Sequence, residues 1–497
     1  MLFNSIQFLI FFPIVALFYF AIPHRFRYIW LLLASYYFYM CWNPKYALLI
    51  ATSTVITWAS GILIDQSNQL TKNKKQQAYE KKLWVAMSFI SNLAILFFFK
   101  YFDFALNNIN AVLAQFHFEL IQPGFDVILP VGISFYTFQA LSYTMDVYRG
   151  EIYAEKNIFK YALFVSFFPQ LVAGPIERSK NLLIQFHEKH YFDYERVKNG
   201  LLLMLWGFFM KLVIADRIAM LVDQVYNNWQ QYAGLEIVIA TVLFAVQIYC
   251  DFGSYSNIAI GAAQVMGFTL MENFRHPYFA TSVADFWRRW HISLTSWFRD
   301  YLYIPLGGNR KGKLRRYINV MIVFLVSGLW HGASWHFVVW GGLNGIYQVI
   351  GDLTRPYRKK VIEAFKINTQ CFSYRMFQAV MTFILVDFSW VFFRADGFKV
   401  AIQMIKQMVS VFNPWILFDG TLFTLGMDGK DFTVAIIAIA ILWFVDYCHT
   451  KGSVRQWIGQ QNLVFRWGLY YAAIFSILIF GIYGFGYDAA AFIYFQF

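Results

Sequence analysis

The chain has 497 residues, of which 59% are hydrophobic, 21% aromatic and 14% charged. Soluble domains carry about 25% charged residues, so this composition, with a mean hydropathy of +0.47, excludes an ordinary soluble protein and indicates a polytopic membrane protein. The formal net charge is +13. Its Lys and Arg residues stand in short loops between apolar runs, which is typical of membrane topology, so we do not interpret this charge as nucleic-acid binding.

The four cysteines are far apart in the sequence and include no CxxC pair. They are Cys41, Cys250, Cys371 and Cys448. This pattern predicts single buried thiols, with neither a disulfide framework nor a metal site. The apolar run at 8–22 lacks the basic region and cleavage site of a signal peptide, so we predict that it is a retained first span.

Apolar runs and basic loops alternate along the first quarter of the chain. A span needs about 20 mostly apolar residues, and basic loops lie in the cytoplasm. The predicted spans here are 8–22, 28–42, 46–63 and 83–104. Basic residues at 24–27 and 72–82 then make these loops cytoplasmic, and place the N-terminus and the polar stretch 107–115 outside.

The middle of the chain is less regular, because Pro and Gly interrupt the apolar sequence between 129 and 180. Broken backbone at membrane depth is tolerated where it is buried in protein or lines a cavity, so we predict short helices and re-entrant turns around a cavity. Ordinary spans are expected at 201–215 and 237–250. The stretch 251–266 is rich in small residues, which suit close helix packing.

The last part of the chain repeats the alternation. A basic loop at 355–360 precedes three predicted spans, at 376–393, 432–447 and 467–483. The tail is therefore expected outside the membrane. There are no repeats, linkers or low-complexity segments, so we treat the chain as one all-α domain.

Four of the nine histidines lie between Asn273 and Asn344. They are His276, His291, His331 and His336. Thr281 and Ser282, followed by Asp285, predict a helix start. A helix from there to about Phe298 would place Trp287, Trp290, Leu294 and Trp297 on one face, with His291 beside that face.

Basic residues flank these histidines. Arg288 and Arg289 are too polar to face lipid, so we expect them at headgroups, a carboxylate or a ligand phosphate. The sequence LGGNRKGKLRR at 306–316 adds five more basic residues beside glycines. Two interpretations stay open: a cytoplasmic basic loop, or a site for an anionic cofactor such as the phosphates of coenzyme A, although GxxxxGK[ST] is absent.

The apolar segment 317–351 lies between two cytoplasmic loops and must therefore cross the membrane an even number of times. It is too short for two full spans and a turn, which predicts a tight helical hairpin inside the membrane with WHGASWH, at 330–336, near its bend. An ionisable residue at that depth indicates a functional site, and histidine can move a proton near neutrality. A satisfied core histidine is the alternative that composition leaves open.

Metal and serine chemistry have weaker support in this segment. His331 and His336 are five residues apart with no acid between them, which does not match HExxH. Ser327 and Ser334 lack the GxSxG context of a nucleophile.

Five motifs together resemble the membrane-bound O-acyltransferase (MBOAT) family. They are LVAGPIER at 171–178, NFRHPY at 273–278, DFWRRWHISLTSW at 285–297, YIPLGGNRKG at 303–312 and LWHGASWHFVVWG at 329–341. Within the family the chain is most similar to the bacterial branch of the alginate O-acetyltransferase type, whose relatives act on peptidoglycan and teichoic acid. The resemblance covers nearly the whole chain. It implies a funnel-shaped fold in the inner cell membrane, with about 11 transmembrane helices plus re-entrant and short interfacial helices, a catalytic core at 128–352 and an external aromatic tail at 484–497.

The resemblance also implies a reaction, which is acyl transfer from a thioester donor to a hydroxyl. The donor substrate would be cytoplasmic acetyl-CoA, with no permanently bound cofactor and no metal. The embedded catalytic histidine of the family falls on His331 and its second histidine on His291. We expect donor contacts from Asn273, Arg288, Arg289, Arg310, Lys311 and Arg315. The acceptor polysaccharide stays open, and D-alanyl transfer to teichoic acid is an alternative.

The sequence ends in FIYFQF, with Tyr494 among aromatic residues. One interpretation is an aromatic belt at the outer interface. The resemblance suggests another, because in the teichoic-acid branch a small partner protein ends in a similar motif whose tyrosine is thought to carry the acyl group. Tyr494 would then pass acetyl groups to a periplasmic or surface O-acetyltransferase of the SGNH type.

Two other classes of function remain to be weighed. A transporter could use the histidines as a proton relay, but the spans lack the paired broken helices of many transporter folds. A structural subunit of a polysaccharide export complex is the third class. Only an enzyme would release free coenzyme A in a histidine-dependent way.

Overall fold

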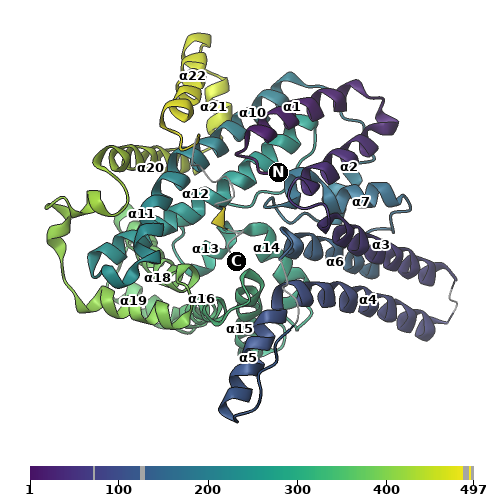
Figure 1. Ribbon diagram of the computed structural model, residues 1–497, viewed down its shortest axis with the longest axis horizontal. Helices are drawn as coiled ribbons and strands as arrows, with labels where there is room; N and C mark the ends of the chain where they lie inside the picture. The colour runs from purple at the N-terminus through teal and green to yellow at the C-terminus, as the bar shows by residue number, and fades with distance from the viewer. Residues whose placement is uncertain (71–72, 124–128, 485–491, 494–497) are drawn as a thin grey trace. The chain divides into compact units, whose positions relative to one another are not determined.

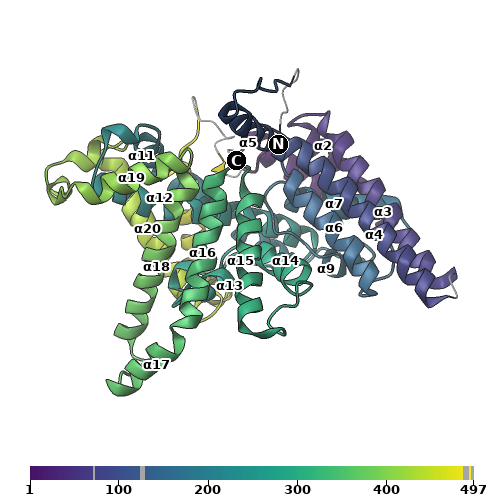
Figure 2. The ribbon, with the colours of Figure 1, turned by 90° about the horizontal axis from the view of Figure 1, so that it is seen from below.

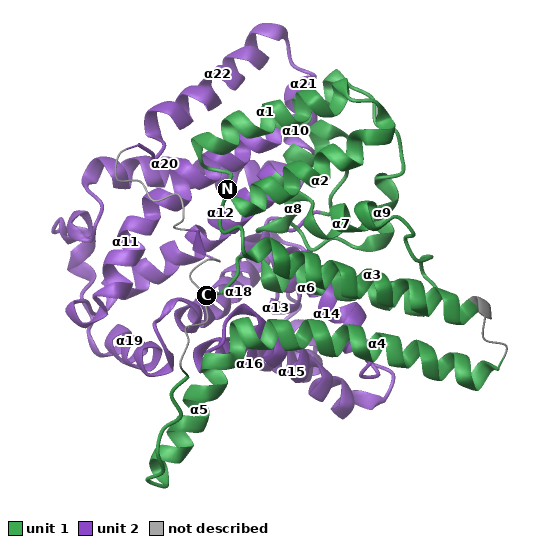
Figure 3. Cartoon of the chain, turned by 45° about the vertical axis from the view of Figure 1, so that its right-hand side comes forward, with its two compact units in different colours: residues 1–201, 259–271 green, residues 202–258, 272–497 purple. Residues whose placement is uncertain are grey.

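The computed structural model describes residues 1–70, 73–123, 129–484 and 492–493, and these residues form helices and connecting segments without a β-strand among them (Figure 1). The chain consists of two compact units (Figure 3). Unit 1 comprises Met1–Leu201 and Ala259–Met271, and unit 2 comprises Leu202–Ile258 and Glu272–Phe497. The prediction of an all-α protein is confirmed.

Unit 1 contains the N-terminal helices. They are α1 (Ile6–Ala21), α2 (His24–Met40), α3 (Tyr46–Leu70), α4 (Lys74–Leu96), η1 (Phe97–Tyr101), α5 (Phe102–Gln115), α6 (Ile133–Arg149), α7 (Ile158–Ser166), α8 (Phe168–Leu171) and α9 (Ser179–Gln185). Helices α3, α4 and α6 lie side by side in Figure 2. In the core of this unit the rings of Tyr143 and Tyr161 are 4.3 Å apart, and the Tyr161 hydroxyl donates to Thr57 Oγ1 over 2.7 Å. The short helices expected between 129 and 180 are confirmed.

Two helices are divided between the units, namely α10 (Tyr194–Phe208) and α12 (Leu235–Met266). Unit 2 holds all the later elements. They are η2 (Phe209–Ala215), α11 (Asp216–Asn227), η3 (Trp229–Gln231), η4 (Pro277–Phe279), α13 (Val283–Arg289), α14 (Ile292–Phe298), η5 (Arg299–Tyr303), α15 (Gly312–His331), α16 (Trp335–Leu353), α17 (Arg355–Ala364), α18 (Phe372–Arg394), α19 (Phe398–Ser410), η6 (Pro414–Leu417), η7 (Thr421–Thr424), α20 (Gly429–His449), α21 (Val454–Gly459) and α22 (Leu463–Phe480).

Six of the described helical runs are long and apolar enough to cross a membrane. They are Tyr46–Asn68, Lys74–Gln115, Leu235–Met266, Phe372–Arg394, Gly429–His449 and Leu463–Phe480, and Ile6–Ala21 is a shorter apolar helix. The chain is therefore a multi-pass membrane protein by its helices, as predicted. The polar stretch 107–115 forms the last part of the helical run that begins at Lys74.

Helix α12 is longer than the sequence predicted, since 237–250 and 251–266 form one continuous helix of 32 residues. The small residues of its second half do allow close packing. A Cβ on Gly207 of α10 would lie 2.8 Å from the Ser254 carbonyl oxygen, within unit 2. The expected role of these small residues is confirmed.

Helices α15 and α16 form the predicted hairpin, with the WHGASWH segment at its bend (Figure 2). Both helices extend beyond 317–351 and contain 20 and 19 residues. At 1.5 Å per residue each is about 30 Å long, which is the length of a span, although neither is among the six described runs that are also apolar enough to cross a membrane. The helices touch where a Cβ on Gly341 would lie 2.2 Å from the Phe324 carbonyl oxygen and 3.1 Å from the Gly328 Cα.

We predict that Gly341→Ala destabilises the protein, because the added methyl group meets backbone that cannot move without separating α15 from α16. Overpacking of this kind lowers the free energy of unfolding by about 1–3 kcal/mol. The matched control is Gly351→Ala in the same helix, where a Cβ meets nothing within 4 Å and alanine is the better helix former. Thermal unfolding in detergent measures both, and equal midpoints for the two variants would contradict this packing.

Candidate functional site

Two histidines that are forty positions apart in the sequence face each other inside unit 2. His291 lies between α13 and α14, and His331 is the last residue of α15. Their ring centroids are 6.2 Å apart, and their exposed fractions are 0% and 4%. The structure thus brings together the two residues to which the sequence assigned catalysis.

The helix that carries His291 is interrupted at this residue. The Ser282 hydroxyl accepts from the Asp285 backbone N–H, as the predicted helix start requires, but α13 ends at Arg289 and α14 begins at Ile292. The predicted continuous helix to Phe298 is wrong. His291 itself has φ +45° in the left-handed region, where a residue other than glycine costs about 1–3 kcal/mol.

The segment that begins at Asn273 explains the interruption. The Ile292 backbone N–H donates to the Asn273 carbonyl over 2.9 Å, and the Arg275 N–H donates to the Arg289 carbonyl over 2.8 Å. Backbone groups that leave a helix need other partners when they are buried. This crossing segment supplies them, so tertiary contacts override the local preference for a longer helix.

The side chain of Asn273 also sets the tautomer of His291. Asn273 Oδ1 accepts from the Ser293 backbone N–H at 3.3 Å, while its Nδ2 donates to Ser256 Oγ at 3.0 Å, so the amide orientation is fixed. Oδ1 lies 3.1 Å from His291 Nδ1. An oxygen acceptor there requires Nδ1 to carry the hydrogen, and in a neutral ring Nε2 then has the free electron pair.

Burial keeps this ring neutral. His291 lies outside the six apolar runs that could cross a membrane, yet it is fully enclosed, and the loss of solvation lowers its pKa to about 3 because the charged form is penalised. Nε2 of the neutral ring can therefore accept a hydrogen bond throughout the physiological range.

Aromatic rings surround His331. Its centroid lies 5.0 Å from those of Trp330 and Trp340 and 5.5 Å from that of Phe393 in α18. Trp340 stacks on Trp390 at 5.5 Å. Such walls exclude water and strengthen the electrostatic interactions inside them. Trp330 and Trp340 belong to the motif that the sequence placed around His331, and pairing of α16 with α18 adds Trp390 and Phe393.

Asn344 of α16 ties this wall to α13. It accepts from Trp287 Nε1 over 3.1 Å and donates to the Trp340 carbonyl over 3.0 Å and to Ser389 Oγ over 3.3 Å. Trp287, Trp290, Leu294 and Trp297 are all buried, although the break between α13 and α14 means that they do not share the face of one helix.

The basic residues that were predicted to bind the acyl donor lie away from the His291–His331 pair. Arg310, Lys311 and Arg315 are exposed at the start of α15, and His331 is at its other end, about 30 Å away by helix length. Arg288 is exposed, and Arg289 pairs with Asp285 at 3.1 Å. Asn273, which was predicted among the donor contacts, is buried against His291. A ligand that reached from the basic loop to His331 would have to be an extended molecule.

A buried charge cluster in unit 2 was not predicted. Lys211 Nζ lies 2.5 Å from Asp251 Oδ1 and 2.8 Å from Asp216 Oδ1. The signal in the sequence is present, since charged residues inside apolar segments are functional candidates by default. Near this cluster the rings of Phe492 and Tyr255 stack at 4.1 Å. Tyr494, the predicted acyl carrier, lies outside the described residues.

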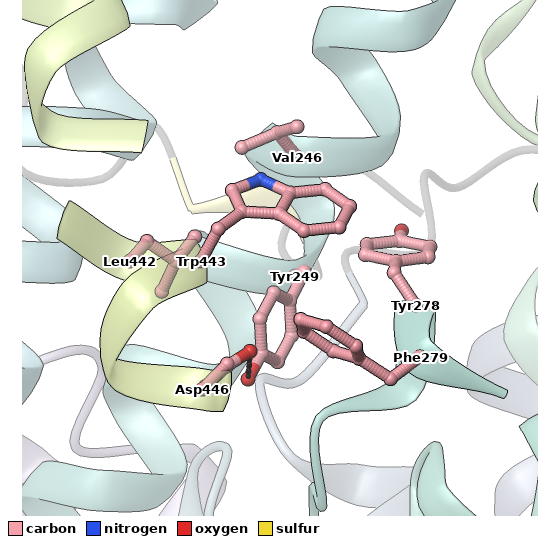
Figure 4. Close-up of a pocket in the computed structure, with 7 residues that line it drawn as sticks. All are labelled: Val246, Tyr249, Tyr278, Phe279, Leu442, Trp443 and Asp446. Atoms are coloured by element: carbon pink, nitrogen blue, oxygen red, sulfur yellow. Dashed lines mark hydrogen bonds between the residues drawn. The ribbon is translucent and has the colours of Figure 1, made fainter. Parts of the chain in front are cut away.

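A separate hollow lies between α12, η4 and α20 (Figure 4). Its lining residues are Val246, Tyr249, Tyr278, Phe279, Leu442, Trp443 and Asp446. The Tyr249 hydroxyl donates to Asp446 over 2.9 Å. His291 and His331 are not among the lining residues, so the hollow is distinct from the histidine pair.

The two other histidines of the stretch have different surroundings. His276 stacks on His449 with centroids 6.2 Å apart, and His336 Nδ1 lies 2.8 Å from Ser334 Oγ.

Comparison with known proteins gives consistent matches. Residues 155–395 match the model described as MBOAT, membrane-bound O-acyltransferase family. The chain is 36% identical to a probable alginate O-acetylase AlgI of Pseudomonas syringae pv. tomato, over 89% of this chain and 81% of that protein. It is 36% identical to the peptidoglycan O-acetyltransferase of Helicobacter pylori, over 77% of this chain and 74% of that protein. A teichoic acid D-alanyltransferase of Streptococcus thermophilus is 30% identical over 46% of this chain and 59% of its own length.

We predict that His291 stays neutral in the wild-type protein between about pH 5 and pH 8, because its lowered pKa lies below this range. Asn273→Asp places a carboxylate at Nδ1, which favours the imidazolium and raises the pKa, so this variant should take up a proton as the pH falls. Histidine NMR in detergent would follow the ring, with His291→Ala to assign its signal. A wild-type signal that titrates near the ordinary histidine pKa would contradict the buried neutral ring.

Proposed function

Since this chain belongs to the membrane-bound O-acyltransferase family and is a multi-pass membrane acyltransferase, we propose that it takes acetyl groups from cytoplasmic acetyl-CoA and passes them across the membrane for O-acetylation of a cell-envelope or extracellular polysaccharide. The observation that carries the proposal is the buried His291–His331 pair within the family-matched segment 155–395. The relatives named as alginate and peptidoglycan O-acetyltransferases support acetyl as the acyl group and a polysaccharide as the final acceptor.

His331 is the proposed base. A hydroxyl oxygen attacks the thioester carbonyl carbon, a C–O bond forms, and the C–S bond breaks. The proton moves from the hydroxyl to His331 and then to the departing thiolate, which leaves as free coenzyme A. The aromatic walls around His331 support this role, because a dry site strengthens base catalysis and the stabilisation of developing charge.

His291 is the proposed second polar group. The sequence left open whether it holds the carbonyl, the thioester or a water molecule. Its Nδ1–H donates to Asn273, so Nε2 of the neutral ring can only accept. An acceptor cannot stabilise a carbonyl oxygen, and His291 is therefore better suited to hold a water molecule or the attacking hydroxyl.

The donor would enter from the cytoplasmic side, which is the side that the basic residues indicate. Arg310, Lys311 and Arg315 are exposed at the start of α15, where they could contact the phosphates of coenzyme A. The extended shape of coenzyme A suits the separation between this loop and His331. In this topology both termini are external, and the membrane is the inner cell membrane.

Tyr494 is the proposed acyl carrier. The two residues before it, Phe492 and Ile493, are buried in unit 2, and the Phe492 centroid is 6.5 Å from that of Phe252, which in turn is 4.7 Å from His291. A carrier would hand the acetyl group to a periplasmic or surface transferase of the SGNH type. D-alanyl transfer is less well supported, because the D-alanyltransferase relative matches a smaller part of the chain.

We predict that His331→Ala leaves a folded protein but slows release of coenzyme A from acetyl-CoA at least about 100-fold, since a general base contributes about that much or more. His336→Ala is the matched control, because His336 is also partly enclosed but bonds to Ser334 and should retain most activity. Near wild-type rates in His331→Ala would contradict the assignment of the base.

We also predict that the purified protein gains the mass of one acetyl group after incubation with acetyl-CoA, and that Tyr494→Phe abolishes this adduct by removing the phenol. Intact-mass analysis is the measurement, with Tyr483→Phe as a control in the same part of the chain. If no adduct forms on Tyr494 while acetyl export continues at the wild-type rate, the carrier role is wrong.

A further inference from the structure

The Lys211–Asp216–Asp251 cluster has a connection to the end of the chain. Asp251 Oδ1 accepts from Lys211 Nζ over 2.5 Å, and its second oxygen, Oδ2, accepts from the Ile493 backbone N–H over 2.8 Å. A carboxylate inside a membrane protein is costly and is retained where its partners have a use. Both oxygens of Asp251 are thus engaged, one by a cation and one by a segment 242 residues later.

The residue before Ile493 is held by a ring. Phe492 stacks on Tyr255 with an interplanar angle of 28°, and Tyr255 is one helical turn after Asp251 on α12, so both lie on the same face of that helix. Lys211 Nζ is 6.0 Å from the Tyr255 centroid and 5.9 Å from that of Phe492. The same ammonium group therefore faces the carboxylate and both rings.

These contacts fix the segment both by side chain and by backbone. The Phe492 ring stacks on Tyr255, and the Ile493 backbone N–H donates to Asp251 Oδ2. A shift by one residue would remove the ring from Tyr255 and turn the neighbouring side chains to other directions. The contacts of the two described residues, Phe492 and Ile493, therefore specify the register of the segment.

We propose that Lys211, Asp251 and Tyr255 form a tail latch, which positions Phe492 and Ile493, the two residues that precede the proposed acyl carrier in the sequence, with the Phe492 ring near Phe252. Asp251 is the positioning residue for the tail backbone, Tyr255 is the platform for Phe492, and Lys211 orients the Asp251 carboxylate. The purpose of the latch rests on the proposed function, but its existence does not.

Asp216 distinguishes a latch from a merely structural ion pair. It contacts Lys211 at 2.8 Å as Asp251 does, whereas the tail bond is made by Asp251. Asp251→Leu leaves the Lys211–Asp216 pair in place. Asp216→Asn leaves Lys211–Asp251 and the bond to Ile493 in place. A cluster that only joins η2 to α12 would respond to both substitutions in the same way.

The test is trimming of the full-length protein in detergent by a carboxypeptidase, followed by intact-mass analysis. Passage of the enzyme through Ile493 and Phe492 should be at least ten-fold faster in Asp251→Leu than in the wild type, with Asp216→Asn close to the wild type. Phe492→Ala, which alters no helix, should also be trimmed at least ten-fold faster, and it keeps the test valid if Asp251→Leu does not fold. Equal trimming of wild type and Phe492→Ala, or equal acceleration by Asp216→Asn and Asp251→Leu, would overturn the latch.

The same variants separate the latch from the acyl carrier. If Asp251→Leu frees the tail and acetyl transfer continues at the wild-type rate, the latch stands and the carrier role of Tyr494 is wrong. If the tail stays protected in Asp251→Leu and Phe492→Ala while Tyr494→Phe abolishes transfer, the latch is wrong and the carrier stands.

Discussion

The hydrogen bond between Asn273 and His291 is the interaction on which the site depends. The same segment that supplies the amide also pairs with the backbone where α13 gives way to α14. This one crossing segment therefore permits the left-handed backbone at His291, fixes the tautomer of its ring and turns the ring toward His331. If α13 continued as a regular helix, the ring would leave this position, and the histidine pair would not form.

The position of His331 has a different origin, which is close packing between α15 and α16. Gly328 and Gly341 let the two backbones touch, and the bend then follows His331 directly. The short distance between the helices brings Trp340 against the histidine ring, while α18 adds Phe393. The glycines bring α15 and α16 close together, and the aromatic side chains then cover the His331 ring. The site is dry because both conditions are met.

Patterns that depend on local sequence predicted much of this fold. Apolar runs predicted the helices α1 to α4, α18, α20 and α22, and the WHGASWH segment predicted the hairpin bend. The two catalytic candidates came from the family motifs, not from periodicity. The break at His291 could not be predicted, since the sequence from Ser282 to Phe298 has the apolar spacing of one helix, and the contacts that break it come from Asn273, outside that segment. The tail contact at Asp251 is likewise non-local.

In unit 2 a cluster of buried charged residues and the pair of buried histidines occupy different positions. Full burial makes an imidazolium unfavourable, so His291 remains a neutral hydrogen-bond acceptor. One group of buried charges lies at Lys211, Asp216 and Asp251, where the ammonium group offsets part of the negative charge of the two carboxylates and the second carboxylate oxygen of Asp251 accepts from a backbone N–H. The Phe252 ring centroid lies 4.7 Å from that of His291 and 6.5 Å from that of Phe492, which precedes the residue that Asp251 binds. Such a division lets the protein hold a segment of chain electrostatically next to a site that must stay neutral.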